Sequence, residues 1–93
     1  MPRYVIERDL PGAGALTQRQ LQLISRKSRD VLVELGTDIQ WIESFVTPDK
    51  LYCVYVAPDE ELILKHALRG GFPATRVSEI VTMISPATAD GVA

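Results

Sequence analysis

The segment Leu51–Pro73, LYCVYVAPDEELILKHALRGGFP, constrains the fold most, because it joins an apolar strand to a helix with clear ends. Leu51–Ala57 is rich in β-branched and aromatic residues, which favour strands. Pro58 suits the first helical position, and the acids Asp59–Glu61 suit the positive end of a helix dipole. A Gly-Gly pair then predicts the end of the helix. The sequence therefore predicts strand and helix in one compact unit.

Four other segments complete the pattern. Arg3–Arg8 and Ile39–Val46 are strand-like, and a four-residue link from the latter to the next strand predicts an antiparallel hairpin. Between them, Thr17 begins an amphipathic helix with a capping-box pattern, and Gly36 ends it. The apolar segment Arg76–Ile84 predicts a fourth strand.

The resulting order β-α-β-β-α-β is that of the ferredoxin-like α+β sandwich. We therefore expect a four-stranded antiparallel sheet with two helices on one face. Residues 1–86 are predicted to form a single domain, and residues 87–93 a flexible C-terminal tail.

Composition narrows the function classes. The 93 residues are 46% hydrophobic and 24% charged, with a net charge of −2, which is typical of a globular domain. No basic patch stands out, so nucleic-acid binding is not expected. A single cysteine favours a reducing compartment, and no apolar run is long enough for a signal peptide or a membrane span. We expect a cytoplasmic protein without a membrane partner, and self-association to complete its small core.

Strict strand alternation predicts two unlike sheet faces. The aliphatic face, expected to pack under the helices, carries Ile42, Ser44, Val46, Tyr52, Val54 and Val56. The other face, expected to stay uncovered, carries Trp41, Glu43, Phe45, Leu51, Cys53 and Tyr55. An uncovered face with several aromatic side chains usually meets a partner or a ligand.

The candidate metal ligands are His66, Glu43, Glu60 and Cys53. Imidazole, thiolate and carboxylate groups are the ligands that hold zinc, nickel or copper. No CxxC, HxxxH or HExxH motif occurs, however, and His66 can instead be a helix-edge histidine bonded to a carbonyl or carboxylate. Cys53 is either a nucleophile activated by His66 or a small buried hydrophobe.

The candidate ligand-binding or interface residues are Trp41, Ser44, Phe45, Tyr55 and Tyr4. Aromatic rings can stack on a planar ligand, and they are also enriched in homodimer interfaces. Both interpretations are open at this point.

Four motifs resemble those of a small bacterial family of ferredoxin-like proteins that includes a streptomycete member named nickel-binding protein. They are W-x-x-S-F-V at Trp41–Val46, Y-C-V-Y at Tyr52–Tyr55, A-P-D-E-E at Ala57–Glu61 and H-A-x-x-G-G-F-P at His66–Pro73. The resemblance covers Pro2 to Pro86. It implies a homodimer formed through the open sheet face, and a capacity for nickel or a similar divalent metal without catalysis. Carried over by position, it points to Trp41, Ser44, Cys53, Tyr55, Glu60 and His66.

Two main functions remain. The first is a homodimeric, non-catalytic protein that binds nickel or another divalent transition metal. The alternative is a small-molecule-binding module or enzyme of the dimeric α+β barrel kind, with a pocket near Cys53 and His66. A plain interaction module, in which the interface takes up all the aromatic side chains, is a third interpretation.

Overall fold

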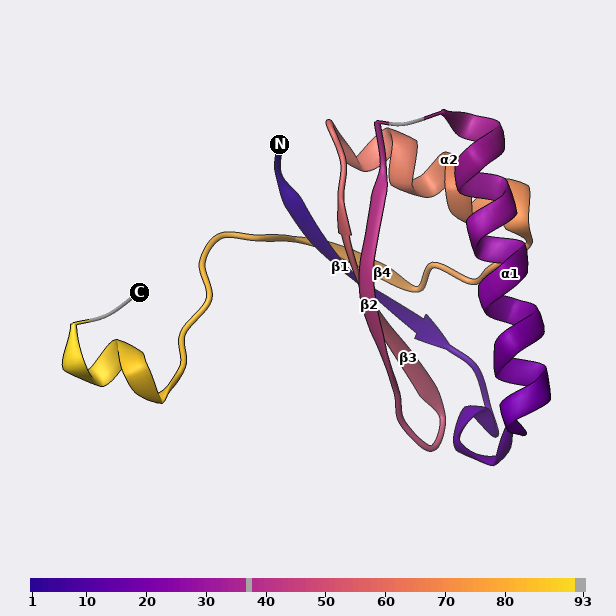
Figure 1. Cartoon of the computed structure of the whole chain (residues 1–93), viewed down its shortest axis with the longest axis horizontal. Helices are drawn as coiled ribbons and strands as arrows, with labels where there is room; N and C mark the ends of the chain where they lie inside the picture. Colours follow the sequence, from indigo (N-terminus) through magenta and orange to yellow (C-terminus); the bar gives the residue numbers. More distant parts are fainter. Residues whose placement is uncertain (37, 92–93) are drawn as a thin grey trace.

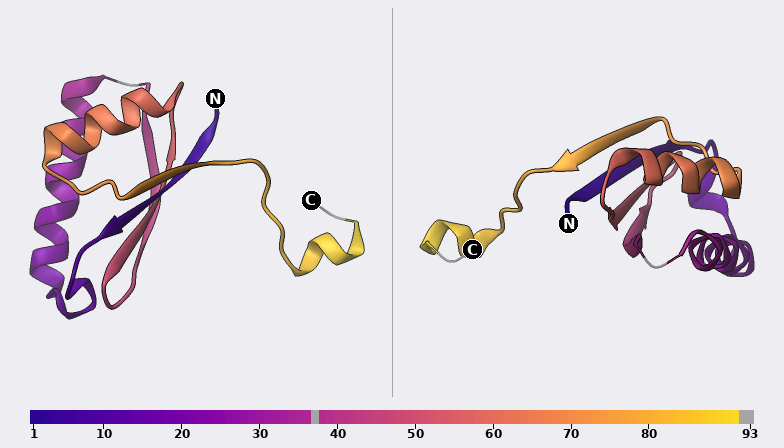
Figure 2. Two further views of the ribbon diagram at one scale, coloured as in Figure 1. Left: turned by 180° about the vertical axis from the view of Figure 1, so that it is seen from behind. Right: turned by 90° about the horizontal axis from the view of Figure 1, so that it is seen from above.

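The computed structural model describes residues 1–36 and 38–91 (Figure 1). Its elements, in chain order, are β1 Arg3–Asp9, η1 Ala13–Ala15, α1 Gln18–Leu35, β2 Gln40–Val46, β3 Lys50–Val56, α2 Glu60–Gly70, β4 Arg76–Ile80 and η2 Pro86–Asp90. The strands form one antiparallel sheet in the order β2-β3-β1-β4. Figures 1 and 2 show α1 and α2 on the same side of this sheet. The predicted ferredoxin-like α+β fold is confirmed.

The first helix begins as predicted. The Thr17 side chain accepts a hydrogen bond from the Gln20 amide at 3.1 Å, and the Thr17 amide donates to Gln20 Oε1 at 2.9 Å. Gly36 ends α1 with a positive φ of 100°. The second helix begins later than predicted: Asp59, not Pro58, borders it, and its carboxylate accepts from the Leu62 amide at 2.9 Å. A capping carboxylate satisfies a free amide, and this fixes where α2 begins.

The fourth strand is shorter than predicted. It ends at Ile80 instead of Ile84, and Ile80 lies opposite Arg3, the first residue of β1. Beyond that pair β1 offers no further strand backbone, and the Pro2 carbonyl is bonded to the Ala57 amide on the opposite side of β1. The chain then extends away from the domain as a C-terminal arm, residues 81–91, with exposed apolar side chains at Val81, Met83 and Ile84 (Figures 1 and 2). The arm carries η2, while residues 92 and 93 of the predicted tail lie outside the described residues.

The assignment of the two sheet faces was wrong. The helices cover the face that carries Tyr4, Ile6, Cys53 and Tyr55, all of them buried in the core with Ile39, Ala57 and Ile63. On β2 the strict alternation fails, because the pairing register shifts between Trp41 and Glu43. As a result Trp41 lies opposite Tyr55 and Ser44 opposite Cys53, on the covered face.

The uncovered face carries the alternate side chains of each strand. Val54 pairs with Val5 and with Glu43, and Tyr52 pairs with Phe45. Phe45 and Ile42 are about half exposed, at 55% and 51%. The uncovered face is thus an aliphatic and aromatic surface, with Glu43 exposed upon it.

Within the described residues, neither helix has the length and apolar character needed to cross a membrane.

Candidate functional site

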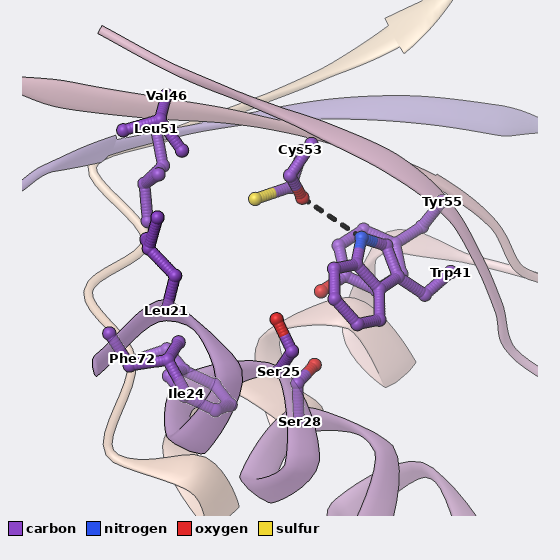
Figure 3. A pocket seen from close by; sticks show the side chains of 11 residues that line it. Leu21, Ile24, Ser25, Ser28, Trp41, Val46, Leu51, Cys53, Tyr55 and Phe72 are labelled. Carbon is purple, nitrogen blue, oxygen red and sulfur yellow. Dashed lines mark hydrogen bonds between the residues drawn. The ribbon is translucent and has the colours of Figure 1, made fainter. Parts of the chain in front are cut away.

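A pocket of about 70 Å³ lies between α1 and the covered face of the hairpin β2–β3 (Figure 3). A cavity needs roughly 10–15 Å³ to hold one water molecule, so this pocket has room for several water molecules or a small organic molecule. Its wall is mostly apolar, with three serine hydroxyls and one thiol among the lining groups. The lining residues are Leu21, Ile24, Ser25, Ser28, Trp41, Ser44, Val46, Leu51, Cys53, Tyr55 and Phe72.

The bulge in β2 builds one wall of the pocket. With one extra residue between them, Trp41 and Ser44 point to the same side, and Trp41 Nε1 donates to Ser44 Oγ at 2.9 Å. A partly buried indole N–H needs an acceptor, and this bond supplies it while fixing the plane of the ring.

The end of α2 supplies Phe72. Gly71 adopts the left-handed conformation with φ 68°, and the Phe72 amide donates to the Ala67 carbonyl at 2.9 Å. This turn directs the chain back toward the sheet, and the Phe72 ring then lies directly against Gly70 and lines the pocket.

Cys53 is 5% exposed and lies in β3 between Leu51 and Tyr55. Figure 3 shows its sulfur directed into the space between the strands and α1. The thiol is therefore a pocket group, opposite the hydroxyls of Ser25 and Ser28.

His66 is fully buried under the sheet, next to the pocket wall. Its Nε2 lies 3.4 Å from Ser28 Oγ and 3.5 Å from the Ser28 carbonyl oxygen, and its ring centroid lies 5.3 Å from that of Tyr55. Its Nδ1 has no hydrogen-bond partner among the described residues. Burial lowers the pKa of His66, the Ser28 backbone bond opposes this shift, and the charge of Arg8 adds to it. The ring is therefore neutral near pH 7.

Arg8 is a site residue that the sequence analysis missed. It is only 3% exposed, its Nη1 donates to the Pro73 carbonyl at 2.5 Å, and its guanidinium carbon lies 5.6 Å from the centre of the Phe72 ring. The other terminal nitrogen, Nη2, has no partner among the described residues. Strand alternation was the available signal, since Arg8 follows Tyr4 and Ile6 on the covered face.

Tyr55 connects these groups. Its hydroxyl neighbours both Arg8 and Ser28, and its ring is 2% exposed. Burial raises the pKa of Tyr55, and the positive charge of Arg8 opposes that shift. Tyr55 therefore remains a neutral phenol that can donate a hydrogen bond.

The structure brings together only some of the predicted residues. Trp41, Ser44, Cys53 and Tyr55 share the pocket, and Tyr4 belongs to the core. Glu43 and Phe45 lie on the uncovered face, and Glu60 is exposed in the first turn of α2. Across residues 1–36 and 38–91, no three or more His, Cys, Asp or Glu side chains form a group that could hold a metal ion.

Comparison with known proteins gives two matches of different kinds. The sequence profile of a family described as "Nickel responsive protein SCO4226-like" matches residues 4–80. The crystal structure of SCO4226 from Streptomyces coelicolor A3(2) is similar in fold, with a TM-score of 0.74 and 18% sequence identity over 88% of this chain and 99% of that chain. No curated protein matches the chain significantly.

The neutral state of His66 predicts a specific pH dependence of stability. Because the folded-state pKa of His66 lies below its ordinary value of 6.5, the unfolded chain takes up a proton near pH 6.5 that the folded chain does not. Stability contributed by His66 is present above that pH and is lost as the pH falls. Urea unfolding from about pH 7.5 to about pH 5.5 should thus show a larger loss in the wild type than in His66→Gln. Equal losses in the two proteins would contradict this assignment.

Proposed function

The chain belongs to the family of SCO4226-like nickel responsive proteins, and we propose that it is a small homodimeric, non-catalytic binding protein that holds a small molecule between α1 and the sheet. The observation that carries this proposal is the pocket itself: an apolar space of about 70 Å³ with a fixed tryptophan wall and a few hydroxyls. Apolar pockets with a few converging polar groups are the usual form of small-molecule sites.

The arrangement of His66 favours binding over catalysis. A nucleophilic cysteine needs a base beside it, but His66 Nε2 is directed to Ser28, not to Cys53. The Ser28–His66 pair also lacks the third group that would orient Nδ1 in a catalytic triad, as far as the described residues extend.

Trp41 provides a direct test of occupancy, since it is the only tryptophan and lines the pocket. Isobutyrate and isobutyramide, two probes of nearly the same shape, are titrated while Trp41 emission and the melting temperature are recorded. At least one of them should change the emission and raise the melting temperature. In Ser25→Leu, which fills the pocket, the response should weaken by roughly tenfold or more, since overpacking excludes the probe.

Lys27→Leu is the matched control, because Lys27 is exposed on the same helix outside the pocket. It should respond like the wild type. No response from either probe in the wild type would contradict the pocket proposal.

The uncovered sheet face supports the homodimer. It holds Val5, Val54 and Tyr52 on the two central strands, with the exposed Phe45 beside Tyr52, and the acids Glu7 and Glu43 lie among them. An exposed surface that mixes apolar and aromatic side chains with a few charged ones is compatible with a protein interface. The C-terminal arm also exposes apolar side chains that a second copy would cover.

Light scattering after size exclusion tests the dimer. The wild type should have the mass of two chains, and Phe45→Glu should shift the mass toward one chain because a charge would be buried without a partner. Leu68→Glu is the control, since Leu68 is 84% exposed on α2. A wild type with the mass of one chain would contradict the dimer.

Nickel binding is the second candidate, and the family description favours it. The donors described within one chain do not fit a nickel site, because His66, Cys53, Glu43 and Glu60 do not converge. A site shared between two copies remains open to Glu43, which is exposed on the uncovered face. His66, in contrast, is enclosed in the core.

Calorimetric titration with nickel distinguishes these cases. If two copies share the site, Glu43→Gln should lose most of the binding heat, and His66→Gln should keep it. Glu61→Gln, an exposed acid on α2, is the control and should bind like the wild type. If His66→Gln loses the binding heat and Glu43→Gln retains it, the metal is bound by His66 instead. If the wild type gives no binding heat, the nickel proposal is wrong.

A further inference from the structure

We infer that the ligand of the pocket is a small aliphatic carboxylate and that Arg8 binds its charged end. This inference rests on the proposed function, because it names the chemical class of the molecule that the pocket takes. It is carried by a buried cation that has no anion beside it.

The charge of Arg8 has no counter-ion among the described residues. Arginine remains protonated in proteins, and buried arginines are normally paired with a carboxylate. The three ion pairs of the described chain, Lys50–Glu7, Lys50–Asp9 and Arg69–Glu34, are all at the surface and do not include Arg8. At 3% exposure, the guanidinium is also shielded from solvent. The guanidinium of Arg8 therefore lacks a negatively charged partner.

Arg8 borders the inner wall of the pocket. It lies over the ring of Phe72 and next to the hydroxyl of Tyr55, and both of these side chains line the pocket. A carboxylate that entered the pocket and displaced the Phe72 ring would reach Nη2, the terminal nitrogen without a partner. A hydrogen bond between two ionised groups is about twice as strong as a neutral one.

A second unpartnered atom lies against the same ring. The centroid of the His66 ring is 5.6 Å from that of Phe72, and Nδ1 of His66 has no partner. Nε2 faces both the Ser28 hydroxyl and the Ser28 carbonyl oxygen, so the position of the proton on the neutral ring depends on which of these two groups Nε2 bonds. Nη2 of Arg8 is a donor in either case, and it is the group that binds a negatively charged oxygen in this inference.

The rest of the pocket defines the body of the ligand. Its far wall is aliphatic, with Leu21, Ile24 and Leu51, and its volume of about 70 Å³ limits the body to a few carbon atoms. A multiply charged inorganic anion would lose its hydration against this wall without gaining enough donors. A singly charged acid with a short branched chain fits both parts of the site, because its carboxylate can bind Arg8 and its chain can contact the aliphatic wall.

The isosteric pair isobutyrate and isobutyramide tests this inference at neutral pH. With Trp41 emission as the readout, the wild type should bind isobutyrate roughly tenfold or more tightly than the amide, because only the acid brings a negative charge that pairs with the guanidinium. Sodium chloride at equal ionic strength should not reproduce the response. In Arg8→Met, which keeps an unbranched apolar stem but removes the guanidinium and its charge, the preference for the acid should disappear. Circular dichroism confirms that this variant is folded.

The outcomes separate the two proposals. No response to either probe refutes the occupied pocket itself. Equal affinities for acid and amide in the wild type would support an occupied pocket but overturn the inference that its ligand is a carboxylate. A chloride response equal to that of isobutyrate, or a preference that persists in Arg8→Met, also overturns the role of Arg8. The comparison of acid and amide uses the wild type alone, so the inference stays testable if Arg8→Met does not fold.

Discussion

One extra residue in β2 decides what the helices cover. With strict alternation, Trp41, Glu43 and Phe45 would share a face, and the carboxylate of Glu43 would point under α1. A charge there would lose its hydration without a partner. The bulge after Trp41 sends Glu43 and Phe45 to the uncovered face and turns Ser44 inward. Ser44 then accepts the bond from the Trp41 indole, so the irregularity in the strand and the tryptophan wall of the pocket have the same cause.

The core encloses three polar or charged side chains among the described residues. Besides aliphatic and aromatic side chains it encloses Arg8, Ser28 and His66, and two of these retain a nitrogen without a hydrogen-bond partner among the described residues. Each unpaired polar atom costs free energy of folding. A ligand that binds only the folded state would recover part of this cost and raise the stability with the logarithm of its concentration above Kd. The folding cost of these two atoms and the proposed ligand binding thus concern the same part of the fold.

The order of elements could be predicted from the sequence because it depends on local signals. Thr17 with Gln20, Gly36 and the Gly-Gly pair fix the ends of the helices through bonds made within a few residues. The face of each β2 side chain could not be predicted, since nothing in IQWIESFV marks the bulge. The end of β4 depends on where β1 begins, which is a tertiary constraint. Arg8 was missed although its register was readable, because arginine is rarely buried and its residue type gives no signal of a core position.

The two proposed functions occupy opposite faces of one sheet, and β3 belongs to both. Cys53 and Tyr55 of this strand line the pocket, while Tyr52 and Val54 lie on the uncovered face. Side chains of alternate residues do not touch across the backbone, so a substitution at Phe45 or Glu43 changes the uncovered face without entering the pocket. Any effect of pocket occupancy on self-association would have to pass through the backbone of strands such as β2 and β3, which contribute side chains to both faces. The fold thus keeps the proposed pocket and the proposed dimer face chemically separate, and connects them through the strands that carry side chains of both.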